Sequence, residues 1–163
     1  MTELDISIDD PMSSDVAQLL GDHLTFAQKW SSPDEVHVLD AERLASDAVL
    51  FFSARMVGRL LAVGALRTLN ETHVEIKSMH TADEARGQGV GQAMLEYLLA
   101  AARGQGFARV SLETGQGDAF APARSLYRRS GFEICPPFGD YRISADSVCM
   151  TLGLSAPSLS STQ

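Results

Sequence analysis

The sequence predicts one α/β domain, a mixed sheet of the α+β type with helices on both faces. Apolar residues recur at helical spacing in some segments and alternate with polar residues in others. In addition, a glycine-rich loop joins a strand segment to an amphipathic helix segment. The predicted order of elements is β-α-α-β-β-β-α-β-α-β-β. The chain has 163 residues, so we expect a single domain at 1–153 and a flexible, serine-rich tail at 154–163.

The first elements are a strand and two helices. Residues 4–8 alternate apolar and polar side chains, which is typical of a half-buried strand. Residues 13–30 carry an apolar stripe at helical spacing and predict a long amphipathic helix. We expect a loop at 31–40, which contains a proline, and then a short second helix at 41–46.

The next segments predict a meander of strands. Residues 48–55 and 59–69 flank a turn that contains glycine, so we expect an antiparallel hairpin, and residues 74–81 form the strand after it. The remaining elements are a helix up to Gly104, a strand at 107–114, a helix at 120–130, and closing strands at 132–135 and 147–152.

The composition excludes several classes of protein. The net charge of −8 disfavours a nucleic-acid partner, because phosphate binding requires a cationic face. No apolar run approaches the roughly 20 residues that span a membrane, and the acidic residues 1–10 do not resemble a secretory signal. Two cysteines, Cys135 and Cys149, make neither a disulfide framework nor a metal motif. We therefore expect a cytoplasmic protein with reduced thiols, no nucleic-acid partner and no membrane partner.

Residues 86–91, RGQGVG, carry the clearest chemical signal. They lie where a strand ends and a helix begins, and unpaired backbone N–H groups at a helix start attract phosphate. Glycines allow an anion to approach the backbone, and Arg86 adds a fixed cation. The loop predicts a site for a pyrophosphate group.

Other phosphate-binding loops fit this segment less well. A Walker loop requires Lys and then Ser or Thr after its last glycine, whereas Gln92 and Ala93 follow Gly91. A dinucleotide fingerprint requires a third glycine or alanine, and that place holds Gln92 or Met94. Glu113 ends the next strand, where an acidic residue that binds ribose belongs, so a nicotinamide-dependent oxidoreductase stays open as an alternative.

The loop, read as R/Q-x-x-G-x-G/A, resembles the acetyl-coenzyme A loop of the GNAT superfamily of N-acetyltransferases. Residues 123–132, ARSLYRRSGF, resemble the family's A-x-x-L-Y-x-x-x-G-F segment, and the resemblance covers roughly residues 4–152. Residues 75–91, Glu113 with Thr114, and residues 138–141 also resemble a bacterial subgroup of poorly defined substrate. The resemblance implies an acetyltransferase with this fold and leaves a homodimer open.

The resemblance also implies which residues bind acetyl-CoA. The backbone around the glycines would hold the pyrophosphate, and the strand before the loop would pair with the pantetheine arm. A bulge in that strand would leave the Met79 N–H group to polarise the thioester carbonyl. The implied donor-binding residues are Met79, His80, Thr81, Arg86, Gly87, Gln88, Gly89, Val90, Gly91 and Gln92.

Two residues are candidates for acid and base. Tyr127 would protonate the departing thiolate, since a phenol is protonated at neutral pH, although it is also explained as a core residue with a satisfied hydroxyl group. Glu75 would accept a proton from the amine. It alternates with Val74 and Ile76, so we expect it to share a face with Lys77 and Met79, and a surface ion pair with Lys77 is the other explanation.

One position departs from the family pattern, and the acceptor site is weakly marked. Many relatives carry an asparagine seven residues before the tyrosine, where this chain has Phe120, so that polar contact with the donor is in doubt. The four histidines have no metal-ligand spacing, and we expect no metal. Candidate acceptor contacts are His37, Phe138 and Tyr141.

These features predict direct transfer of an acetyl group from acetyl-CoA to an amine through a tetrahedral intermediate. A small-molecule amine and a protein amine are both open as acceptors. Besides the oxidoreductase, a non-catalytic module that binds acyl-CoA is the alternative. Such a module would not need Tyr127 and Glu75.

Overall fold

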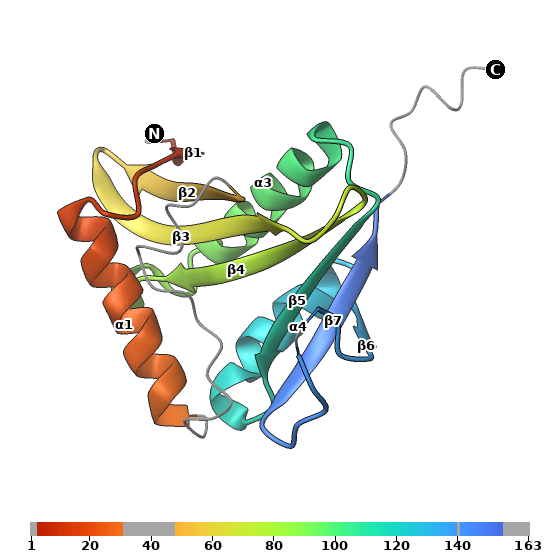
Figure 1. Cartoon of the computed structure of the whole chain (residues 1–163). Coiled ribbons are helices and arrows are strands. Elements are labelled where there is room, and N and C mark those ends of the chain that lie inside the picture. Colours follow the sequence, from red (N-terminus) through yellow and green to blue (C-terminus); the bar gives the residue numbers. More distant parts are fainter. Residues whose placement is uncertain (1–2, 31–47, 140, 155–163) are drawn as a thin grey trace.

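A computed structural model describes residues 3–30, 48–139 and 141–154 of the chain (Figure 1). Its elements are the strands β1 (Asp5–Ile8), β2 (Val49–Met56), β3 (Arg59–Thr68), β4 (His73–Thr81), β5 (Arg109–Gly115), β6 (Glu133–Cys135) and β7 (Ser147–Gly153), the helices α1 (Ser14–Trp30), α3 (Val90–Gly104) and α4 (Ala121–Arg129), and the short 3₁₀ helices η2 (Asp83–Ala85) and η3 (Asp118–Phe120).

The seven strands form one mixed sheet in the order β1-β2-β3-β4-β5-β7-β6. Only β4 and β5 pair in parallel, and the other neighbours are antiparallel. This confirms the predicted mixed sheet, the hairpin of β2 and β3, and the order of the described elements. The second helix, predicted at 41–46, lies outside the described residues.

Two hydrophobic cores lie on opposite faces of the sheet, as the predicted layers require (Figure 1). On one face, the apolar stripe of α1 packs against β2 and β3, for example Val16 against the side of the sheet that contains Phe51. On the other face, Met94 and Leu98 of α3 and Tyr127 of α4 belong to a larger core. Since successive strand residues point to opposite faces, Phe52 belongs to that larger core.

The contacts of Leu154 bear on the predicted boundary between the domain and the tail. Leu154, which we assigned to the tail, donates its N–H group to the Ala108 carbonyl at 2.8 Å and packs against the larger core. Residues 155–163 lie outside the described residues.

Cys135 and Cys149 are opposite one another on β6 and β7, and both are free thiols.

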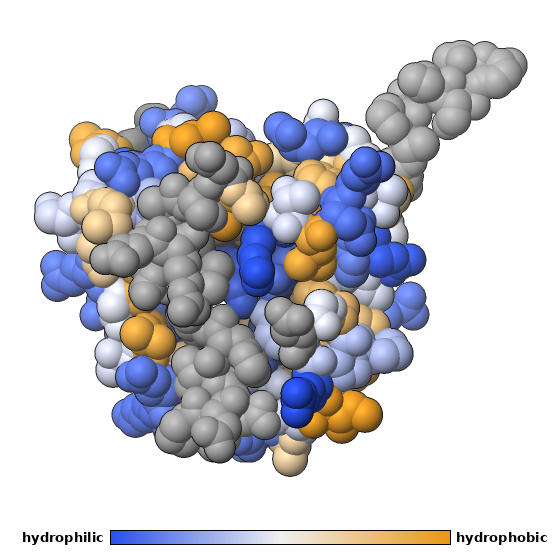
Figure 2. Space-filling model, in the orientation of Figure 1, coloured by the Kyte–Doolittle hydropathy of each residue, from blue (hydrophilic) through white to orange (hydrophobic). Residues whose placement is uncertain are grey.

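The surface carries few large apolar side chains among the described residues. Ile8, Met12, Val57, Ile134 and Ile143 are more than half exposed. On the face shown in Figure 2, hydrophobic residues occur in small groups separated by hydrophilic ones. Among the described residues, no helix has the length and apolar character needed to cross a membrane.

Candidate functional site

A pocket of about 640 Å³ lies where β4 and β5 separate. The two strands pair only from His73 opposite Arg109 to Glu75 opposite Ser111. Beyond that point β4 stays with β3 and β5 stays with β7, and Figure 1 shows the two strands diverging. The pocket is lined by both separated strand ends, by α1, by the start of α3, and by η3 with α4.

β4 carries a bulge just after it leaves β5. The register against β3 shifts here, so that Ser78 and Met79 both lie opposite Gly64. Ser78 has φ 56°, a left-handed conformation that is uncommon for residues other than glycine. A Cβ atom on Gly64 would lie 3.0 Å from a methyl carbon of Leu98, so this position faces α3 at close range.

The bulge exchanges the faces of the sheet to which the next side chains point. Met79 packs against the core under α3, so the prediction that it shares a face with Glu75 and Lys77 is wrong. His80 now points to the α1 side, where its ring meets that of His23. A regular strand would have put His80 on the opposite face.

The start of α3 has the features of an anion site. Gly87 and Gly89 have φ 77° and 82°, and a Cβ atom on either would meet nothing within 4 Å. The first turn of α3 contains no acidic residue, which leaves the positive end of the helix dipole uncompensated there. The Arg86 guanidinium group lines the pocket, forms an ion pair with Asp83 at 3.2 Å and lies over the Phe26 ring.

The structure brings together all of the predicted donor-binding residues except one. Gln88 does not line the pocket, and its side-chain amide donates to the Glu84 carbonyl at 3.0 Å. Gly91 explains why α3 can start so close to β4. A Cβ atom there would lie 3.3 Å from Oγ1 of Thr81, so a larger residue would push the helix away from the strand.

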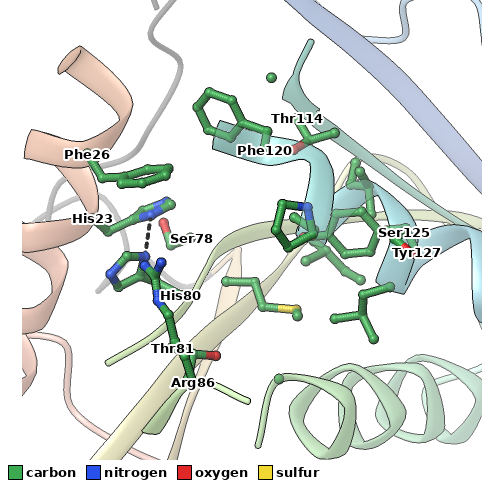
Figure 3. A pocket seen from close by; sticks show the side chains of 18 of the residues that line it. His23, Phe26, Ser78, His80, Thr81, Arg86, Thr114, Phe120, Ser125 and Tyr127 are labelled. Atoms are coloured by element: carbon green, nitrogen blue, oxygen red, sulfur yellow. Dashed lines mark hydrogen bonds between the residues drawn. The ribbon is translucent and has the colours of Figure 1, made fainter. Parts of the chain in front are cut away.

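Tyr127 lies in the pocket wall formed by α4 (Figure 3). It is 6% exposed and its ring makes an edge contact with Phe132. Burial raises the pKa of Tyr127 to about 12, and no described residue forms a hydrogen bond with its hydroxyl group. A core tyrosine usually has a satisfied hydroxyl group, so this arrangement favours a group that is available to a ligand.

Glu75 is buried behind the pocket wall and does not line the pocket. Its carboxylate accepts a hydrogen bond from the Tyr141 hydroxyl and lies 3.6 Å from Nζ of Lys77. Nζ of Lys77 in turn donates to the Tyr141 hydroxyl oxygen at 2.7 Å. Nη1 of Arg67, whose side chain is partly exposed, lies 3.8 Å from the other oxygen of the Glu75 carboxylate. The ion pair with Lys77, which was the other explanation of Glu75, is therefore present but buried rather than on the surface. Among the described residues, Lys77 and Tyr141 connect Glu75 to the pocket, which both of them line.

Burial shifts the pKa values of Lys77 and Tyr141. Burial lowers the pKa of Lys77, although the Glu75 carboxylate opposes that shift. Burial raises the pKa of Tyr141, and the adjacent carboxylate raises it further, so the phenol keeps its proton at any physiological pH.

Two neutral histidines form the α1 side of the pocket. Nδ1 of His23 and Nδ1 of His80 are 3.1 Å apart, so one ring donates to the other (Figure 3). Burial lowers the pKa of His23 to about 3, helped by His80 and Lys77. Burial lowers the pKa of His80 to about 4, with Arg86 in the same direction and Asp83 and Asp22 opposed.

Aromatic rings close the pocket between α1 and η3. Phe120 makes an edge contact with Phe26 at a centroid distance of 5.3 Å. Its ring also occupies the space above Gly115, where a Cβ atom would be 2.1 Å from a ring carbon. Phe120, which departs from the family pattern, thus forms an apolar wall.

Two of the predicted acceptor contacts are not part of the described pocket. Phe138 does not line it and instead contacts His73 and Tyr141, and His37 lies outside the described residues.

The lining residues that were not predicted from the sequence as site residues include His23, Phe26, Lys77 and Ser78. Lys77 could have been found, because it alternates with Glu75 on one strand. His23 and Phe26 lie on the stripe that indicated only a packed helix, and nothing in the local sequence marks Ser78.

The sequence model of the Acetyltransferase (GNAT) family matches residues 16–132. The "Uncharacterized N-acetyltransferase YsnE" of Bacillus subtilis (strain 168) is 39% identical over 146 residues, which is 90% of this chain and 97% of that protein. A crystal structure from Klebsiella pneumoniae has a TM-score of 0.76 with 24% identity and covers 93% of this chain and 98% of the other. A GNAT family acetyltransferase from Elizabethkingia anophelis, with acetyl-CoA bound, has a TM-score of 0.67, 16% identity and coverage of 93% and 98%.

The buried histidine pair makes stability depend on pH. Both rings are neutral in the folded protein above pH 4, whereas unfolded histidines titrate near pH 6.5. Unfolding therefore takes up protons between about pH 4 and 6.5. Stability is complete above that window and falls as the pH is lowered through it, by about 1.4 kcal/mol per pH unit for each proton.

Thermal unfolding between pH 4.5 and 7.5 measures this effect. The His23→Gln variant should show a flatter dependence of Tm on pH than the unsubstituted protein. This pH range lies above 3.8, the ordinary pKa of an aspartate. The stabilising contributions of Asp9 and Asp15, whose pKa values are lowered in the folded protein, are lost only below that value. Identical pH profiles for the two proteins would contradict a neutral buried pair.

Proposed function

The chain belongs to the acetyltransferase (GNAT) family and is an acyltransferase, and from this premise we propose that it transfers an acetyl group from acetyl-CoA to an amine. We propose direct attack of the amine on the thioester, through a tetrahedral intermediate and without an acylated enzyme. The observation that carries the proposal is the pocket between the separated strands β4 and β5, which has the start of α3 at its edge.

The residues of the pocket fit acetyl-CoA in two places. Gly87 and Gly89 leave open space around the backbone at the positive end of α3, where a pyrophosphate would accept N–H groups from residues 87–92. Arg86 would add a cation at the pocket edge. The edge of β4 from Met79 to Thr81, which is not paired with β5, would pair with the amides of the pantetheine arm as a strand does.

The bulge would then hold the thioester. We assign to the Met79 N–H group the hydrogen bond to the carbonyl oxygen, which gains negative charge as the amine attacks. In the complete reaction, nitrogen forms a bond to the carbonyl carbon and the carbon–sulfur bond breaks. The amine loses one proton and the thiolate gains one, so the products are an amide and free coenzyme A.

We assign the acid role to Tyr127. With a pKa of about 12 it is fully protonated at neutral pH and offers its hydroxyl hydrogen to the departing sulfur. A full transfer to a thiolate is uphill, so the hydrogen bond would act mainly while charge develops on sulfur. The thiolate then takes up a proton from water, and the proton that the amine loses passes through the base to water, so the reaction balances.

We propose that Glu75 is the base and that the Tyr141 hydroxyl group relays the proton to it. The Tyr141 hydroxyl oxygen borders the pocket and its hydrogen is already directed at the Glu75 carboxylate. A proton from the amine would reach Tyr141 while the Tyr141 proton passes to Glu75. The nearby Lys77 ammonium group holds the phenol oxygen in place for this relay.

Neither Cys135 nor Cys149 is among the described residues that line the pocket, which supports direct transfer rather than an acyl-cysteine. Because both thiols are free, we also propose a cytoplasmic location. The acceptor is best identified by screening small amines, amino acids and peptide N-termini for release of free thiol from acetyl-CoA.

Gly89→Glu tests the pyrophosphate site. The new carboxylate would stand at the start of α3, where like charge repels the phosphates, so we expect the affinity for acetyl-CoA to fall at least 100-fold in isothermal titration calorimetry. Gly106→Glu is a matched control, because Gly106 also has a positive φ and open space but lies beyond the other end of α3. Normal binding by Gly89→Glu, or equal loss in both variants, would reject the site.

Tyr127→Phe tests the acid. We expect kcat to fall about 100-fold, within the usual range for a general acid, with an unchanged Kd for acetyl-CoA. The Tm should not decrease, since no described residue bonds to the hydroxyl group. Tyr97→Phe is the control, because Tyr97 lies on the far part of α3 against Phe52 and should keep full activity. Full turnover by Tyr127→Phe would remove the acid assignment.

A further inference from the structure

Ser78 combines two features that are unfavourable for the folded protein. Its backbone has φ 56°, which glycine adopts without the steric cost of a Cβ atom. The residue is 8% exposed, and its hydroxyl oxygen is buried and has no hydrogen-bond partner among the described residues. Burying an unpaired hydroxyl group costs free energy, and alanine at this position would avoid that cost.

Other buried serines of the sheet do not share this situation. Ser53 donates to Asp9 at 2.5 Å, and Ser111 bonds to both His73 and Thr151. All three serines are buried, but only Ser78 among them lines the pocket. An unpaired polar group at a pocket wall, on a strained bulge, indicates a group that waits for a ligand atom.

The position of Ser78 identifies that atom. Ser78 forms the bulge with Met79, whose N–H group we assign to the thioester carbonyl. Only Cβ, Cα and the carbonyl carbon separate Oγ of Ser78 from the Met79 nitrogen, so one acceptor oxygen can receive hydrogen bonds from both. In Figure 3 the Ser78 side chain lies at the α1 side of the pocket wall, beside His23.

We propose that Ser78 is a further catalytic residue whose hydroxyl group donates a second hydrogen bond to the thioester carbonyl oxygen. This inference rests on the proposed function. As the amine attacks, the carbonyl π electrons move onto oxygen, and two fixed donors stabilise the resulting charge. When the electrons return and the carbon–sulfur bond breaks, the thiolate leaves and takes up a proton. Ser78 neither gains nor loses a proton.

Binding of acetyl-CoA and of coenzyme A, compared by calorimetry, tests the contact without knowledge of the acceptor. Coenzyme A lacks the acetyl carbonyl, so Ser78→Ala should weaken acetyl-CoA binding several-fold and leave the Kd of coenzyme A unchanged. With the best amine of the acceptor screen, kcat should fall about 100-fold, the usual effect of losing one such donor.

Two further variants separate catalysis from folding. Ser78→Gly removes the hydroxyl group and the backbone strain together, so equal losses of kcat in Ser78→Gly and Ser78→Ala assign the effect to the hydroxyl group. Ser111→Ala is the structural control. It should lower Tm because two hydrogen bonds are lost, whereas Ser78→Ala should leave Tm unchanged or raise it.

Several outcomes overturn the proposal, and they differ from failure of the proposed function. If the unsubstituted protein binds neither acetyl-CoA nor coenzyme A, the proposed function fails. If it binds both and is active, but Ser78→Ala keeps kcat and the same ratio of the two Kd values, Ser78 is not a donor to the carbonyl. A rise confined to the KM of the amine would place Ser78 at the acceptor instead.

Discussion

The site exists because β4 cannot pair with β3 and β5 at the same time along its whole length. Pairing with β5 ends at Glu75 opposite Ser111, and from there each strand follows its other neighbour. Backbone groups on the inner edges of the two strands then need partners from elsewhere, since buried N–H and C=O groups are seldom left unpaired. A ligand that carries amides along its length can supply them. The pocket lies at this separation, next to the bulge and the start of α3.

The bulge on β4 determines which chemistry faces the pocket. Before it, Glu75 and Lys77 point to the side of α1, and without it the next side chain on that side would be Met79. The extra residue sends Met79 into the core and turns His80 toward His23. One inserted residue therefore places an apolar thioether under α3 and a neutral imidazole pair in the pocket.

Much of the fold follows from local patterns, whereas the site only partly does. The apolar stripes, the hairpin and the glycine loop predicted the elements within a residue or two, and the motif around Gly89 located the start of α3. The burial of Glu75 was not predictable, because Tyr141, which covers it, is 66 residues away in the chain. The position of Met79 was wrong because alternation along a strand assumes no bulge. The role of Phe120 as an apolar wall was not predictable from the sequence either, because it depends on a contact with Phe26, which lies on a different element.

The contact between Phe26 and Phe120, which both line the pocket, joins α1 to the segment that precedes α4. The Arg86 guanidinium carbon lies over the same Phe26 ring, 5.7 Å from its centroid. The spacing of these walls is therefore set by dispersion forces and ring geometry, which salt hardly screens. A ligand that passed between these rings would meet a width that is insensitive to ionic strength, so discrimination by size and shape would persist in concentrated salt, where discrimination by charge fades.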